Sequence, residues 1–108
     1  MRLIFFALAS FALVVPMPAV AQDLRVVTAA ADQDAGSVAT LLADGADPNA
    51  TRADGVTALL WAAHWDDLHT ADRLIAAGAD PDAADDHGVT PLERAAENAS
   101  LPMVERLL

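Results

Sequence analysis

The sequence predicts an all-α solenoid of stacked helix-turn-helix units with hairpin-like loops, preceded by a signal peptide. Two observations carry this prediction. Short motifs recur at a 33-residue step through most of the chain, and residues 3–21 contain no charge whereas all 16 acidic residues follow them. The chain is therefore divided into residues 1–21 and residues 22–108.

Residues 1–21 have the three zones of a secretory signal peptide. Arg2 supplies positive charge, residues 3–15 form an apolar run, and Ala19-Val20-Ala21 offers a small-x-small site. We expect cleavage between Ala21 and Gln22. The alternative is an uncleaved anchor, because the apolar run approaches the roughly 20 residues that span a bilayer. Pro16 and Pro18 favour removal, so the protein is expected to be exported, to the periplasm or beyond it.

The charge of residues 22–108 is strongly acidic. Loss of Arg2 leaves five arginines against 16 acidic residues, a formal charge of −11. Such a surface disfavours nucleic acids and anionic membranes, so neither is expected as a partner. It would attract a basic partner, or it would simply keep an alanine-rich protein soluble. The chain has no cysteine, which excludes disulfides and cysteine zinc sites and favours the periplasm over harsher surroundings.

The 33-residue step is visible in several motifs without any gap. Residues 45–48 (Gly-Ala-Asp-Pro) recur as 78–81, residues 55–57 (Gly-Val-Thr) as 88–90, and Ala62-Ala63 as Ala95-Ala96. A fixed period of this length indicates stacked repeats, in which each unit packs only against its neighbours.

The second copy shows what one unit contains. Thr57 can cap a helix over residues 58–64, on which Leu59, Ala62 and Ala63 share one face. A second helix is expected over residues 68–77, and Gly78 ends it in a left-handed conformation. A turn-rich stretch then leads to the next unit.

These motifs resemble the ankyrin repeat. The family's Gly-x-Thr-Pro-Leu-His-x-Ala-Ala opening appears as residues 88–96 (Gly-Val-Thr-Pro-Leu-Glu-Arg-Ala-Ala), and its turn as residues 45–50 (Gly-Ala-Asp-Pro-Asn-Ala). The resemblance covers residues 24–108 and implies an ankyrin-repeat domain of about three repeats. We place an N-terminal capping repeat at 22–50, a second repeat at 51–83 and a truncated third at 84–108.

The sequence also departs from the family's pattern. Leu60 and Glu93 replace the histidine of the opening motif, so these loops are expected to be less firmly tied together. The first copy lacks the opening turn and is expected to act as a cap. The chain stops inside the last helix, at Leu107-Leu108. Either further repeats follow in a longer array, or this apolar end docks or self-associates.

The chemistry-bearing residues give little support to catalysis. His64 and His69 are five apart, which is poor spacing for zinc, and no cysteine or tyrosine is present. Asp85-Asp86-His87 would bind a cation weakly at best, and an acidic turn is the favoured interpretation. We therefore expect no enzyme, no catalytic residue, no metal and no cofactor.

The resemblance implies instead that a partner protein binds on the concave side, along loop tips and first helices. Trp65 is the leading candidate, because exposed tryptophans are enriched in binding hot spots, although it would otherwise cover a helix turn of its own repeat. Trp61 is expected to fill space between repeats. The partner-binding candidates are Arg52, Ala53, Asp54, Val56, His64, Trp65, Asp86, His87, Val89, Glu97 and Asn98.

The function expected from these observations is a periplasmic or secreted scaffold for protein–protein interaction. Two alternatives stay open: an acidic inhibitor or immunity-type protein that blocks a basic enzyme, and a self-assembling structural protein. Fold alone does not identify the partner.

Overall fold

A computed structural model of the chain describes residues 19–108, with side chains from Asp23 onward. Within residues 19–108 there are six helices and no strand. The helices are α2 (Ala19–Ala31), α3 (Ala35–Ala43), α4 (Ala58–Trp65), α5 (Leu68–Ala76), α6 (Pro91–Glu97) and α7 (Leu101–Leu107).

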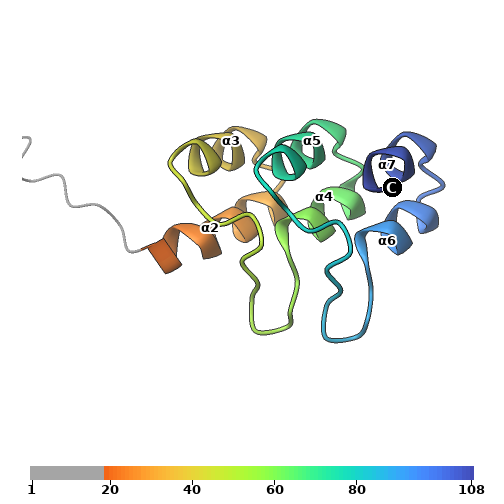
Figure 1. Cartoon of the computed structure of the whole chain (residues 1–108), viewed down its shortest axis with the longest axis horizontal. Helices are drawn as coiled ribbons and strands as arrows, with labels where there is room; N and C mark the ends of the chain where they lie inside the picture. Colours follow the sequence, from red (N-terminus) through yellow and green to blue (C-terminus); the bar gives the residue numbers. More distant parts are fainter. Residues whose placement is uncertain (1–18) are drawn as a thin grey trace, which may run out of the picture.

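The helices form three antiparallel pairs stacked side by side (Figure 1). One row holds α2, α4 and α6, the other holds α3, α5 and α7, and each helix contacts its neighbours in the row and its partner in the pair. Two long loops, residues 44–57 and 77–90, project from the α2–α4–α6 row (Figure 1). The predicted all-α solenoid with hairpin-like loops is therefore confirmed.

Side-chain caps explain why the helices begin where they do. The Thr57 hydroxyl accepts a hydrogen bond from the Leu60 N–H at 3.2 Å, and Thr90 accepts one from Glu93 in the same way. Asp34, Asp67 and Ser100 cap α3, α5 and α7, which we call the outer helices. At the end of α5, Gly78 has a φ of +102°, as predicted for the residue that stops the helix.

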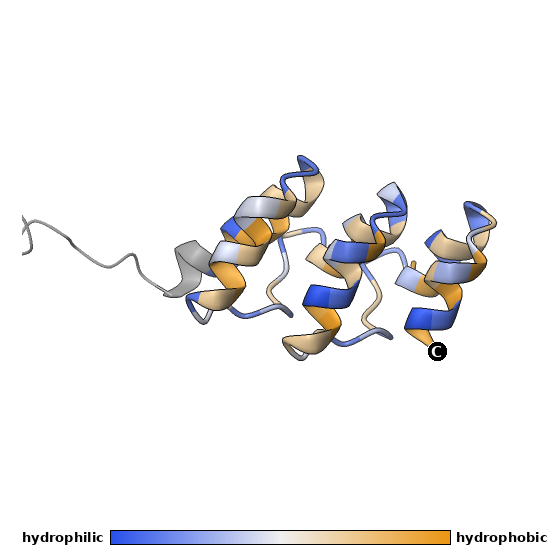
Figure 2. Cartoon of the chain, turned by 90° about the horizontal axis from the view of Figure 1, so that it is seen from above, coloured by the Kyte–Doolittle hydropathy of each residue, from blue (hydrophilic) through white to orange (hydrophobic). Residues whose placement is uncertain are grey.

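The core follows the small and apolar positions of the repeat. Leu59, Ala62, Ala63 and Leu74 are all buried, and Trp61 packs against the same cluster. In Figure 2 the hydrophobic positions concentrate on the helices, while the connecting turns and loops are largely hydrophilic. Because no unit encloses a core of its own, each depends on the next for burial.

The ends of the stack differ in what they expose. At the first unit, Arg25, Asp32 and Asp34 are exposed, as expected for a cap. At the last, Leu107 is buried while Leu101 is 66% and Leu108 88% exposed.

The predicted signal peptide lies mostly outside the described residues. Helix α2 begins at Ala19, so the expected cleavage site between Ala21 and Gln22 falls in its first turn. Asp23 lies beyond that site, and its carboxylate accepts the Asp47 N–H at 2.6 Å. No helix in the described part of the chain is long and apolar enough to cross a bilayer.

Candidate functional site

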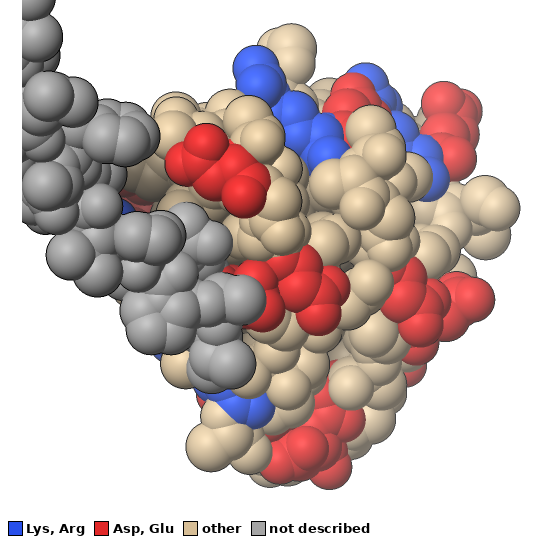
Figure 3. Space-filling view, turned by 60° about the vertical axis from the view of Figure 1, so that its left-hand side comes forward, with Lys and Arg blue, Asp and Glu red and all other residues tan. Residues whose placement is uncertain are grey.

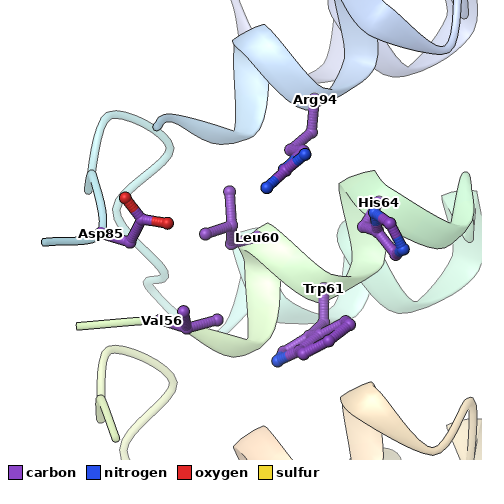
Figure 4. Close-up of a pocket in the computed structure, with 6 residues that line it drawn as sticks. All are labelled: Val56, Leu60, Trp61, His64, Asp85 and Arg94. Atoms are coloured by element: carbon purple, nitrogen blue, oxygen red, sulfur yellow. The ribbon is translucent and has the colours of Figure 1, made fainter. Parts of the chain in front are cut away.

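A pocket of about 120 Å³ opens between α4 and α6, beside the second loop (Figure 4). Three apolar side chains, a histidine, one acidic and one basic side chain surround it. They are Val56, Leu60, Trp61, His64, Asp85 and Arg94.

The 33-residue step places two of these side chains at equivalent positions. Trp61 and Arg94 each stand directly before the paired alanines of their helix, so they occupy the same position in successive units. Ala62, Ala63 and Ala95 are buried, and the side chain before each pair lies at the boundary between units. The pocket is therefore a product of the repeat, closed on one side by an aromatic residue and on the other by a cation.

Helix α4 carries an aromatic cluster next to the pocket. The Trp61 and Trp65 rings stack with centroids 6.2 Å apart, and the His64 ring meets each indole edge-on, at 5.5 Å from Trp61 and 4.7 Å from Trp65. The Nε1 of Trp61 is buried and has no hydrogen-bond partner among the described residues. An unpaired buried donor costs about 1–3 kcal/mol, so Trp61 is held there by its packing alone.

The two charged residues of the pocket are each held by neighbours. The Asp85 carboxylate accepts the His87 N–H at 2.9 Å and the Val89 N–H at 3.0 Å. The Val89 bond is the main reason that the pKa of Asp85 lies below its usual 3.8, and His87 and Arg94 lower it further against an opposing effect of burial. Arg94 pairs with Glu97 of its own helix at 3.1 Å.

The loop tips touch each other. The Asp86 N–H donates to the Asp54 carbonyl at 3.0 Å, and each tip is closed by a short turn, from Gly55 to Arg52 and from Gly88 to Asp85. Asn49 also joins the two loops, because its side chain donates to the Gly78 carbonyl and accepts the Asp80 N–H. Hydrogen bonds thus join the loops without the histidine of the opening motif, and whether the loops are less firmly tied than with it stays a prediction.

Trp65 and Asn98 link successive units. The Trp65 Nε1–H donates to the Ala31 carbonyl at 3.1 Å, while the Asn98 amide donates to the carbonyls of Ala63 and His64 at 2.9 and 3.0 Å. The two residues are 33 positions apart, and each donates hydrogen bonds to backbone carbonyls of the preceding unit. Trp65 remains 41% exposed, but its anchor lies on the preceding unit and not on its own repeat.

The structure gathers the remaining predicted site residues along the two loop tips and α6. Ala53, Asp54, Asp86 and His87 are exposed, and Arg52, Val56 and Val89 are half-buried. Arg52 donates to the Thr28 hydroxyl at 3.0 Å, on the first unit. Four residues of the pocket were not among the predicted partner-binding residues: Leu60, Trp61, Asp85 and Arg94. The equivalence of positions 61 and 94 is a signal in the sequence that points to Trp61 and Arg94.

Negative charge dominates this region. Asp54, Asp85 and Asp86 lie on the two loops, and the space-filling view shows acidic side chains at the lower end of the molecule, where the loops lie in Figure 1 (Figure 3). Asp85 serves as the acceptor of a turn, as the acidic-turn interpretation predicted. Among the described residues, no group of three or more His, Asp or Glu side chains is placed to hold a metal ion.

Comparison with known proteins agrees with the repeat. A family model described as ankyrin repeats in three copies matches residues 26–108. A search of curated proteins finds no match to the chain. Ankyrin repeats are modules of protein–protein interaction, typically without enzymatic activity. With three pairs of helices, two joined hairpin-like loops and a match over most of its length, the chain belongs to the ankyrin-repeat family.

Proposed function

We propose that this protein is an exported scaffold that holds one partner protein against the side formed by α4, α6 and the two loop tips. The observation that supports it is the pocket between α4 and α6, which lies beside an aromatic cluster and next to two loops whose tips are hydrogen-bonded to each other. A preformed surface loses little conformational entropy on association, which favours binding.

The location is part of the proposal. Export follows from the signal-peptide pattern, and the absence of cysteine suits the periplasm. Asp23 would survive cleavage before Gln22, so its contact with Asp47 would persist in the processed protein. Expression of the full-length chain, cell fractionation and N-terminal sequencing of the exported form test this, and a chain still starting at Met1 would contradict it.

The binding surface can be tested by site-specific photocrosslinking in the native host. A photoreactive amino acid replaces Ala53 at the first loop tip or, as the matched control, Ala76 on the outer helix α5; both alanines are exposed. We expect a discrete adduct with one partner from position 53 and none from position 76. Equal adducts from both positions, or an adduct from position 76 alone, would refute the assignment of the surface.

A further inference from the structure

The chemistry of the pocket between α4 and α6 indicates what part of a partner enters it. Its volume is about 120 Å³. Cofactor and substrate sites in proteins are larger, at about 300–1,000 Å³. A pocket of this size suits one side chain of a partner.

The pocket combines an apolar floor with a charged rim. Leu60 and Trp61 line it from α4 and Val56 lines it from the end of the first loop, whereas the carboxylate of Asp85 faces Leu60 from the second loop (Figure 4). Long cationic side chains suit such a lining, because their methylene stems cover apolar surface while the charged head stays at the rim. An indole ring adds attraction for a cation.

The charges around the pocket indicate whether a cationic or an anionic side chain of a partner would enter it. On one wall lies Asp85, in the loop whose tip bonds to the other loop through the Asp86 N–H and the Asp54 carbonyl, so two further acidic residues stand at the adjoining tips. On the opposite wall, Arg94 is paired with Glu97 at 3.1 Å, which offsets its charge. Arg52, the cation of the first loop, is turned to Thr28 on the first unit. The lining itself holds one carboxylate, Asp85, and one guanidinium, Arg94, and the acidic residues around it (Asp54, Asp86 and Glu97) give its surroundings an excess of negative charge.

We propose that this pocket receives an arginine or lysine side chain of a basic partner, with the stem along Val56, Leu60 and Trp61 and the cationic head at Asp85. The inference rests on the proposed function and adds the chemistry of the partner to it. The chain's formal charge of −10 would also draw a basic partner toward this surface over a long range.

Short peptides provide the probe. Acetylated, amidated pentapeptides Ser-Gly-X-Gly-Ser, with X as arginine, leucine or glutamate, are titrated into the purified protein at low salt. Binding is followed by ¹H–¹⁵N NMR and by tryptophan fluorescence, which reports only on Trp61 and Trp65 because the chain has two tryptophans. We expect the arginine peptide to shift the resonances of Leu60 and Trp61 and to bind at least fivefold more tightly than the other two.

Two matched variants locate the effect. Asp85→Asn keeps an acceptor oxygen for the N–H groups of His87 and Val89 but removes the charge, and we expect it to weaken the arginine peptide at least fivefold. Asp44→Asn removes one charge from the exposed turn after α3, and we expect less than a twofold change.

Three outcomes would overturn the inference: a leucine or glutamate peptide that binds as well as the arginine peptide, no perturbation of the pocket by any peptide, or equal effects of Asp85→Asn and Asp44→Asn. None of these would refute the scaffold itself, because crosslinking from position 53 does not depend on which side chain enters the pocket.

Discussion

The two junctions between repeats are built differently, although they join equivalent helices. At the first junction, between α2 and α4, Trp61 fills the gap with its N–H unpaired, and Trp65 fixes α4 to the Ala31 carbonyl. At the second, between α4 and α6, the smaller amide of Asn98 stands at the position equivalent to Trp65. The two loops also hydrogen-bond to each other there. Hydrogen bonds cross both junctions, but the first is also filled by aromatic packing, whereas the second leaves a pocket open.

This difference shows how one repeat pattern can form both a packed stack of helices and an open pocket for a partner. A large side chain at the position before the paired alanines closes a junction, and a long polar one at the same position in the next unit leaves room beside it. The surface available to a partner is thus set by very few positions, while the paired alanines and caps keep the stack itself constant.

The largest expected loss of stability comes from a substitution in α4, the helix that takes part in both junctions. Leu59 is fully buried in α4, which contacts both α2 and α6, and we expect Leu59→Ala to cost about 2–5 kcal/mol of unfolding free energy. Leu92, at the equivalent position of α6, is half-buried, so Leu92→Ala should cost less. Urea unfolding followed by circular dichroism measures both, and equal costs would show that the two units do not differ in packing.

The next effect isolates the contact between the loops. Gly55 and Gly88 have nearly the same φ, +77° and +79°, so an alanine at either position costs about 1–2 kcal/mol. A Cβ at Gly55 would also meet the Asp86 Oδ1 at 2.6 Å and its N at 3.1 Å, whereas nothing lies within 4 Å at Gly88. We expect Gly55→Ala to lower the free energy of unfolding by about 1 kcal/mol more than Gly88→Ala. A greater loss for Gly88→Ala would mean that the tips do not touch in solution.

A smaller effect separates the two tryptophans. Trp65→Phe keeps a ring but loses the bond to the Ala31 carbonyl, so we expect a loss of about 1 kcal/mol. Trp61→Phe loses ring area yet also removes the unpaired buried N–H, so its cost should be lower than that of Trp65→Phe. Thermal and urea unfolding of the two variants measure these costs. A larger cost for Trp61→Phe than for Trp65→Phe would contradict the distinction between the two indoles.

The smallest expected effect is a change in melting temperature at acidic pH. Asp34, which caps α3, and Asp85 both have a pKa below the usual 3.8, Asp34 mainly through the Ser37 hydroxyl and Asp85 mainly through the Val89 N–H. Each carboxyl binds its proton less readily when folded, so its contribution is present above pH 3.8 and is lost as the pH falls through the folded pKa. The excess melting temperature of the wild type over Asp34→Asn and Asp85→Asn should therefore shrink below pH 4. A margin independent of pH would speak against ionised acceptors at these turns.

The sequence predicted most of the fold because the repeat determines it. Thr57 as a cap, Gly78 as a helix stop and the burial of Leu59, Ala62 and Ala63 all follow from local rules applied at a known period. Helix ends were placed to within one residue, with α4 reaching Trp65 and α5 ending at Ala76.

The site was harder to predict because it depends on what two units share. Periodicity places Trp61 and Arg94 at one position, but only the stacked helices show that the space between them stays open. Trp65 and Asn98 were expected to face a partner, whereas their nitrogen donors reach carbonyls of the preceding unit. Such contacts cross about 34 residues of chain, beyond the reach of any local pattern.

Asn49 has a consequence for building longer proteins from this one. Its amide both gives and takes a hydrogen bond with the following turn, whereas the residue 33 positions later, Asp82, has a carboxylate that has only acceptors at neutral pH. A designer who inserts further copies of the unit after residue 83 would want asparagine at position 82, so that each added copy is locked to the one before it.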